Sequence, residues 1–79
     1  MGTGVEPDEI ETRFTYPSPG DRDRDKERHR RICAEFKRLA HELNEVLPFS
    51  REAILTFARL EEAHIWAHIA VARHDHDRH

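Results

Sequence analysis

Cysteine, glycine and long apolar runs are all scarce in this sequence. Cys33 is the single cysteine among 79 residues, so no disulfide can form within the chain, and a lone thiol is typical of proteins in a reducing compartment. The longest apolar stretch lies near the C-terminus and is interrupted by His64 and His68, which argues against a membrane span. The 16 acidic residues outnumber the 13 basic ones, which argues against a general nucleic-acid coat protein. We therefore expect a small cytosolic protein that binds neither DNA nor membranes.

Material for a hydrophobic core is also limited, because hydrophobic residues make up 37% of the chain, no more than charged ones. A monomer below about 70–80 residues seldom builds a sufficient core without disulfides, a metal or oligomerisation. Between Ala63 and Ala72, eight of ten residues are apolar, so a helix there is hydrophobic nearly all round and must be buried on several sides. We therefore expect a homo-oligomeric bundle, with Trp66 and Ile69 at the contact between subunits.

The first 20 residues differ in composition from the rest of the chain. They contain all three glycines and three of the four prolines, and prolines bias their neighbours toward extended geometry. We expect residues 1–12 to form a disordered tail. Residues 13–20 should form an extended flap, with Phe14 and Tyr16 as its large apolar anchors.

Two amphipathic helices are predicted after the flap. Asp21 is a suitable N-cap, and an apolar stripe with gaps of three and four predicts a helix over about 22–47. Pro48 ends that helix, and Ser50 caps a second one that runs to about Arg73. The link between them permits only antiparallel packing. The predicted fold is therefore all-α, with a two-helix hairpin over 21–73 and a flexible tail over 74–79.

Positive charge gathers early in the first long helix. The run over 21–31 holds six cations and four acids, but the acids stop at Glu27, and Arg28, Arg30 and Arg31 follow. Arginines three and four residues apart can hold a phosphate through paired N–H donors. A solvated helix face with mixed charges is the alternative.

The aromatic residues just before that basic turn allow two interpretations. A ring near arginines suits a nucleotide, since the ring stacks on the base while the guanidinium neutralises the phosphate. Alternatively, the ring is part of a flap that closes over the hairpin, which is the simpler explanation for Phe14. Because Tyr16 alternates with Phe14, only one of the two needs to be in the core.

Metal chemistry is the alternative function class. Glu61-x-x-His64, with His68 one turn later, has the spacing of metal ligands in helical bundles. Such bundles also need inward-facing acids, and the acids of the first helix flank its apolar stripe or lie away from it. We expect His64 and His68 to be neutral groups at a subunit seam, with no metal or cofactor; a metal-binding bundle on Glu61, His64 and His68 is the alternative. Cys33 is expected to be packed rather than reactive.

Catalysis is not predicted. The sequence shows no set of nucleophile, base and orienting residue, and it has no glycine-rich phosphate loop. The histidine-rich C-terminal end can bind a transition metal weakly, as any such tract can, but a solvated end is the simpler interpretation.

Several short motifs resemble the hairpin domain of small phage anti-defence proteins. The family pattern reads approximately P-x-S-R-E, then L-E-E-A-x-x-W-A, then A-x-A-R. It is matched here at residues 48–52 (PFSRE), 60–67 (LEEAHIWA) and 69–73 (IAVAR), and the family's N-terminal segment is matched from Arg13 to Pro19 (RFTYPSP). The resemblance thus covers about residues 13–73. The sequence departs from the pattern at His64 and His68, where apolar or small amide residues are more usual.

The resemblance implies a function. These proteins are non-enzymatic cyclic-nucleotide sponges that block the CBASS bacterial defence system, and they are helical hairpins assembled as a hexamer. They sequester cyclic dinucleotides and, in some members, cyclic trinucleotides at a second site. By this resemblance Tyr16 stacks on the bases, Arg31 or Arg30 contacts phosphate, and Arg73 serves the second site. The residues expected to bind the cyclic nucleotide are Phe14, Tyr16, Arg28, Arg30, Arg31 and Arg73.

Overall fold

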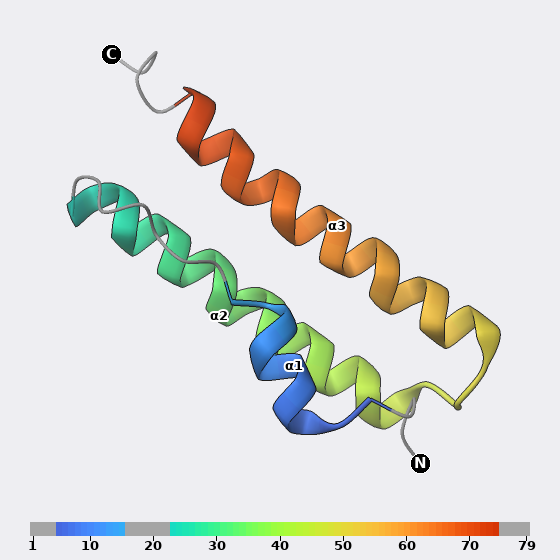
Figure 1. Cartoon of the computed structure of the whole chain (residues 1–79). Coiled ribbons are helices and arrows are strands. Elements are labelled where there is room, and N and C mark those ends of the chain that lie inside the picture. The colour runs from blue at the N-terminus through green and yellow to red at the C-terminus, as the bar shows by residue number, and fades with distance from the viewer. Residues whose placement is uncertain (1–4, 16–22, 75–79) are drawn as a thin grey trace.

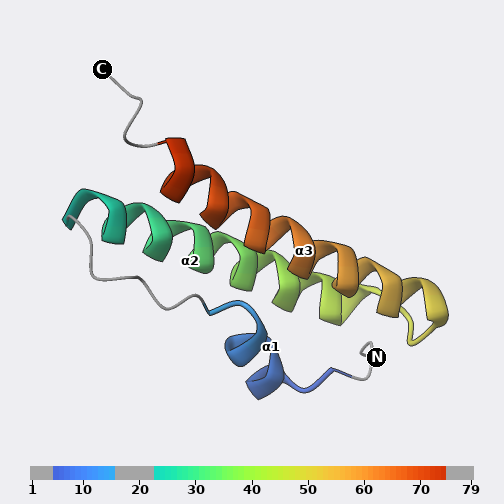
Figure 2. The ribbon, with the colours of Figure 1, turned by 45° about the horizontal axis from the view of Figure 1, so that its top comes forward.

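Three helices make up the part of the chain that the computed structural model describes, which is residues 5–15 and 23–74. They are α1 (Pro7–Arg13), α2 (Asp23–Val46) and α3 (Arg51–His74). The two long helices lie side by side and antiparallel, and α1 lies against them (Figure 1, Figure 2). The predicted all-α hairpin is confirmed, with helix bounds within one residue of those predicted at Val46 and His74.

The turn between α2 and α3 is short because local hydrogen bonds close both helix ends. The amide of Leu47 donates to the carbonyl of Leu43 at 2.9 Å, which completes the last turn of α2 before Pro48. The Ser50 hydroxyl accepts a hydrogen bond from the Ala53 amide at 3.1 Å, the contact of an N-cap. Pro48 therefore follows the end of α2, and Ser50 caps α3, as the sequence predicted.

The N-terminal segment differs from its prediction. Residues 7–13 form α1, so the expectation of a disordered tail through residue 12 is wrong for Pro7 onward, and Arg13 ends a helix rather than starting an extended flap. Pro7 lies in the first turn, where its missing N–H has no helical acceptor to lose. Residues 1–4 of the predicted tail, 16–20 of the predicted flap and 75–79 of the predicted C-terminal tail lie outside the described residues.

The core lies where α1 meets the hairpin. Ile10 of α1 and Phe14, the C-cap residue four positions later, are fully buried against Ala40 of α2 and Phe57 of α3. Four partly buried residues pack around them: Val5, Phe36, Leu43 and Leu60. A third layer thus covers part of the apolar surface that two helices alone leave open.

Polar contacts fix α1 on α2. The Glu11 carboxylate lies 2.8 Å from His41 Nε2 and 3.4 Å from Lys37 Nζ. The Asn44 amide donates to the Val5 carbonyl at 3.1 Å. Together these contacts hold both ends of the α1 segment in register with α2.

Large apolar side chains remain exposed outside this core. Trp66 is 58% exposed and Phe49 is 68% exposed. The other exposed large apolar residues are Leu39, Val46, Ile54, Leu55 and Ile65. Among the described helices, none combines the length and the apolar composition that a membrane span requires.

Candidate functional site

The arginines singled out in the sequence lie on one turn of α2. Their neighbour His29 is buried against α3, where its ring stacks on His68 at 4.9 Å between centroids. Arg30 and Arg31 therefore project away from that contact and are exposed, whereas Arg28 is partly buried. Arg30 forms an ion pair with Glu27 one turn earlier. The turn offers guanidinium groups to the outside of the hairpin.

Arg73 lies at the same end of the hairpin as these arginines. Since α2 and α3 are antiparallel, the N-terminal turns of α2 and the C-terminal turns of α3 are neighbours (Figure 1). Arg73 is exposed and belongs to the last turn of α3. The structure thus brings four of the predicted ligand-binding residues to one end of the molecule.

Phe14 is a correction to the predicted site. Its side chain is completely buried, stacked on Phe36 at 6.3 Å and in edge contact with His64 at 5.5 Å. A ring covered on this many sides has no face left for a nucleotide base, so Phe14 belongs to the core. Tyr16, the other aromatic residue of the predicted site, lies outside the described residues.

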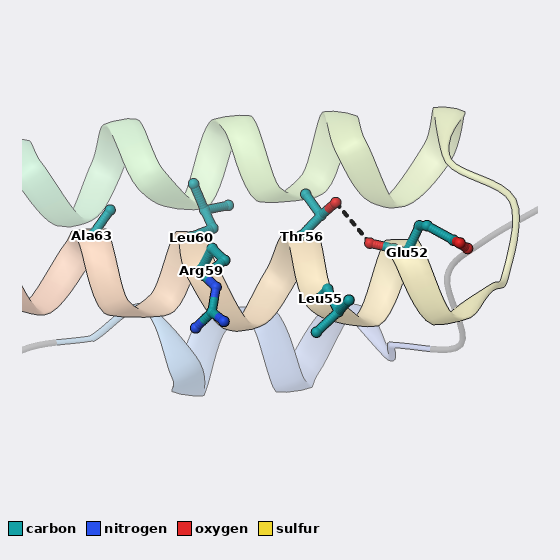
Figure 3. Close-up of a pocket in the computed structure, with 6 residues that line it drawn as sticks. All are labelled: Glu52, Leu55, Thr56, Arg59, Leu60 and Ala63. Carbon is teal, nitrogen blue, oxygen red and sulfur yellow. Dashed lines mark hydrogen bonds between the residues drawn. The ribbon is translucent and has the colours of Figure 1, made fainter.

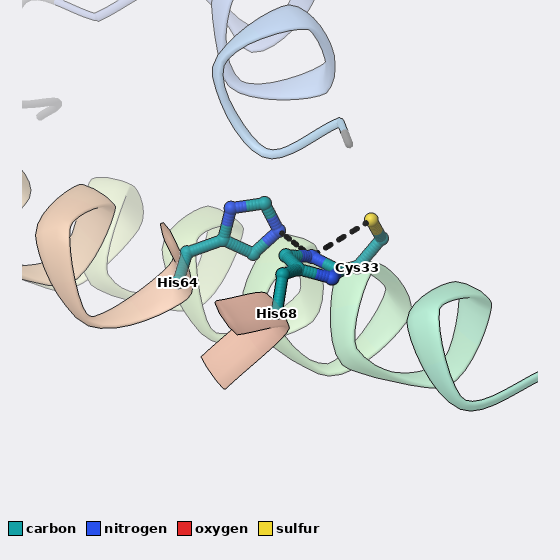
Figure 4. Close-up of side chains that lie close together, drawn as sticks. All are labelled: Cys33, His64 and His68. Carbon is teal, nitrogen blue, oxygen red and sulfur yellow. Dashed lines mark hydrogen bonds between the residues drawn. The ribbon is translucent and has the colours of Figure 1, made fainter. Parts of the chain in front are cut away.

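Three histidines form a buried chain of contacts between α2 and α3. The Nδ1 atoms of His29 and His68 are 2.7 Å apart, and Nε2 of His68 lies 2.9 Å from Nε2 of His64. Cys33 Sγ lies 3.6 Å from the same Nε2 atom of His68 (Figure 4). The expectation that His64 and His68 lie at a subunit seam is wrong, because both face α2 of their own chain.

Burial favours the neutral form of the two histidines of α3, His64 and His68. It lowers the pKa of His64, helped by the positive charge of Lys37. Burial also lowers the pKa of His68, to about 4, with further lowering from the neighbouring His64 and His29. A neutral imidazole has one donor and one acceptor nitrogen, so the rings can bond to one another without a buried charge.

Glu61 does not take part in this cluster, contrary to the alternative metal set. Its carboxylate lies 3.8 Å from the guanidinium of Arg13 and so ties α3 to α1. Cys33 and His29 take part instead, and sequence reasoning did not combine them with the histidines of α3. The sequence did contain a pattern that indicates their burial. The apolar stripe of α2 extends toward the start of the helix with the same spacing, through Ala40, Phe36, Cys33 and His29.

A shallow depression of about 550 Å³ lies on α3 (Figure 3). It is lined by Glu52, Leu55, Thr56, Arg59, Leu60 and Ala63. One acid and one base border a largely apolar floor, and the depression lies in the half of the hairpin near the turn. Its chemistry suits contact with another apolar surface better than it suits a phosphate.

The residues predicted for the contact between subunits lie beyond this depression on α3. Trp66 is exposed and Ile69 is partly buried. Their contact with another subunit remains a prediction.

Comparison with known proteins identifies the family. The sequence model of the family described as Acb2/Tad1, hairpin domain, matches residues 6–72. No curated protein and no solved structure matches the chain. The matched range begins beside α1 and ends two residues short of the end of α3, so it includes the whole core. Because the match covers most of its residues, this chain belongs to the Acb2/Tad1 hairpin-domain family, the anti-CBASS sponges.

Proposed function

We propose that this protein binds cyclic dinucleotides in the host cytosol and sequesters them without cleavage, thereby blocking CBASS immunity. The observation that carries the proposal is the family match over residues 6–72. The exposed arginines on one turn of α2 agree with it, because guanidinium groups bind phosphate oxygens through paired N–H donors. The proposed ligand-binding residues are Tyr16, Arg28, Arg30 and Arg31.

The chemistry around that turn supports binding rather than hydrolysis. Among the described side chains, the histidines beside these arginines are His29 and His68, which are buried against each other between α2 and α3. Neither of these two described imidazoles is therefore placed to act as a general base on a phosphodiester held by Arg30 and Arg31. A sponge needs cations, an aromatic platform and exclusion of water.

Assembly with further copies completes the proposed site. Arg30 and Arg31 lie exposed on an outer face of the hairpin, and large apolar side chains on α3 are left exposed. We place the ligand between subunits of a homo-oligomer, a hexamer by the family resemblance. Two copies of Tyr16 and of Arg31 then enclose a ligand that has near two-fold symmetry.

An estimate of binding energy favours such an enclosed pocket. Two stacked bases contribute about 1–3 kcal/mol each, and two charge-assisted hydrogen bonds about 1.5–3 kcal/mol each. The gross sum is about 5–12 kcal/mol, whereas nanomolar affinity requires about 12 kcal/mol net. Further contacts are needed, and a closed interface between subunits supplies them better than an open groove.

A cyclic trinucleotide is the second ligand class that we propose. Arg73 lies in the last turn of α3, at the same end of the hairpin as the α2 arginines, yet on the other helix. It can therefore contact a ligand that does not reach Arg31. Competition calorimetry distinguishes the two ligand classes, since a ligand at a second site binds to protein already saturated with a cyclic dinucleotide.

Isothermal titration calorimetry with a panel of cyclic dinucleotides tests the main proposal. We expect tight binding of at least one member and much weaker binding of the linear dinucleotide with the same bases. Arg31→Gln should weaken binding tenfold or more, on the order of one charge-assisted hydrogen bond. Arg38→Gln is the matched control, because Arg38 is also exposed on α2 and pairs with Glu35 and Glu42. Absence of heat with every member of the panel contradicts the proposal.

A further inference from the structure

We propose that Cys33, His64 and His68 form a binding site for a divalent transition metal of the zinc class, which ties α2 to α3. The site lies inside the hairpin and is separate from the exposed arginines of the proposed nucleotide site. It also differs from a Glu61-based set, since its third ligand comes from the other helix.

The positions of the three ligand atoms support the site. Cys33 Sγ, His64 and His68 bring their ligand atoms within 4.8 Å of one another. Around a tetrahedral zinc ion, two nitrogens lie about 3.3 Å apart and a nitrogen and a sulfur about 3.6 Å apart, given bond lengths of about 2.0–2.1 and 2.3 Å. The observed distances from His68 Nε2 are 2.9 Å to His64 and 3.6 Å to Cys33. To seat the ion, side-chain adjustments must also bring the third pair, His64 and Cys33, from within 4.8 Å to about 3.6 Å.

Hydrogen bonding alone does not use all of this geometry. The Nε2 atom of a neutral imidazole carries either one proton or one lone pair. Yet both His64 Nε2 and Cys33 Sγ converge on Nε2 of His68 (Figure 4). A cation placed among the three atoms uses a lone pair from each, and the Cys33 thiol gives its proton to solvent on binding.

His29 also supports a metal-binding role for His68, because it contacts the other ring nitrogen of His68. Its Nδ1 lies 2.7 Å from Nδ1 of His68, on the side of the ring away from Cys33 and His64. A histidine that ligates a metal through one nitrogen usually donates the N–H of the other to a fixed acceptor, which sets its tautomer. His29 is in place to be that acceptor.

The location of the site explains what the metal contributes. The turn over 47–50 joins the helices at one end, and the cluster lies in the opposite half, where no covalent link holds α2 to α3. The described core contains only five buried apolar residues. Small domains with so little core commonly depend on a structural metal, and soft thiolate with imidazole ligands suits zinc. The three ligand groups are buried, Cys33 the least completely, so solvent that enters beside Cys33 can fill a fourth position.

Cobalt substitution tests the proposal with an optical readout. The full-length chain carries His74→Ala, His76→Ala and His79→Ala, which removes chelation by the C-terminal histidines, and the thiol is kept reduced. We expect one Co²⁺ per chain, visible bands of a tetrahedral ion, a thiolate-to-cobalt charge-transfer band, and displacement by Zn²⁺. Zn²⁺ should also raise the melting temperature.

Cys33→Ser on the same background should remove the charge-transfer band and weaken Zn²⁺ binding by more than the roughly 10–100-fold that a lost supporting residue costs. His68→Asn should abolish stoichiometric binding. His41→Asn is the matched control, because His41 is partly exposed and contacts Glu11 instead. Circular dichroism verifies the fold of each variant. The proposal is overturned if the tail-substituted chain takes up no stoichiometric Co²⁺, or if its spectrum is unchanged by Cys33→Ser.

Discussion

Phe14 and Tyr16 precede α2, and both were predicted to bind the ligand, with a place in the core as the alternative for Phe14. The structure assigns Phe14 to the core, in ring contact with Phe36 and His64. That outcome agrees with the alternation argument, in which only one of the two rings has to be buried. Tyr16 is consequently the aromatic residue of the proposed nucleotide site, and the two residues should respond differently to truncation.

Substitution of each ring by alanine measures this difference. Phe14→Ala should lower the free energy of unfolding by about 3–5 kcal/mol, because a fully buried ring leaves a cavity. Tyr16→Ala should leave the melting temperature and the oligomer unchanged while abolishing cyclic dinucleotide binding. Thermal denaturation and calorimetry on both variants provide the test, and normal ligand binding by Tyr16→Ala refutes its assignment.

Ser50 provides a second prediction for a single residue. Ser50→Ala removes the hydroxyl that accepts the Ala53 amide, and it should destabilise the protein by about 1 kcal/mol. Thr56→Ala is the control, since the Thr56 hydroxyl bonds back to the Glu52 carbonyl within α3 and caps nothing. Urea denaturation at one protein concentration compares the two. Equal midpoints for both variants contradict a capping role.

At the scale of elements, α1 is the helix that sequence reasoning missed. Pro7 and the nearby glycines were interpreted as signs of irregular structure, whereas a proline in a first turn is compatible with a helix. The decisive feature is tertiary, because Ile10 and Phe14 are one turn apart and both are buried in a cluster with residues of α2 and α3. A helix of seven residues has little stability by itself, so a local pattern could not reveal it.

The attachment of α1 should depend on pH through Glu11. A hydrogen bond from His41, with a further contribution from Lys37, lowers the pKa of Glu11 below 4.5. Because the folded pKa lies below the unfolded one, the stabilisation is present above pH 4.5 and is lost as the pH falls through the lowered pKa. Glu11→Gln should therefore lower the melting temperature at neutral pH and have no effect near pH 2, where both side chains are uncharged. An equal effect at both pH values contradicts this ion pair.

At the scale of the whole molecule, the antiparallel hairpin could be predicted from the sequence, whereas the buried contacts of His29 and Cys33 with His68 between its helices could not. Pro48 and Ser50 mark the turn, and the apolar stripe fixes which face of α2 is buried, so the antiparallel pair follows from local rules. The contacts of His29 and Cys33 with His68 join positions 39 and 35 residues apart. Such pairing depends on the register of two packed helices. The arginines were identified from their spacing in the sequence. That Arg30 and Arg31 are exposed became clear only from the structure, in which their neighbour His29 is buried against α3.

The predicted assembly into a homo-oligomer depends on the exposed apolar residues of α3, above all Trp66. Trp66 is 58% exposed, and a large exposed aromatic side chain on an apolar helix is typical of a protein interface. Trp66→Glu should weaken association by about 2 kcal/mol or more for each contact that it loses. Native mass spectrometry should show smaller species than the parent, while Arg51→Glu, an exposed site on the same helix that does not line the α3 depression, serves as the control. An unchanged mass for Trp66→Glu removes it from the interface.

Capture and release of the ligand tests the central claim most directly. The protein is incubated with the cyclic dinucleotide that binds most tightly, free ligand is removed, the protein is denatured by heat, and the released nucleotide is measured by mass spectrometry. A sponge should return the cyclic dinucleotide intact, in the amount bound, after any incubation time. Recovery of a linear product, or retention of no nucleotide at all, contradicts the account.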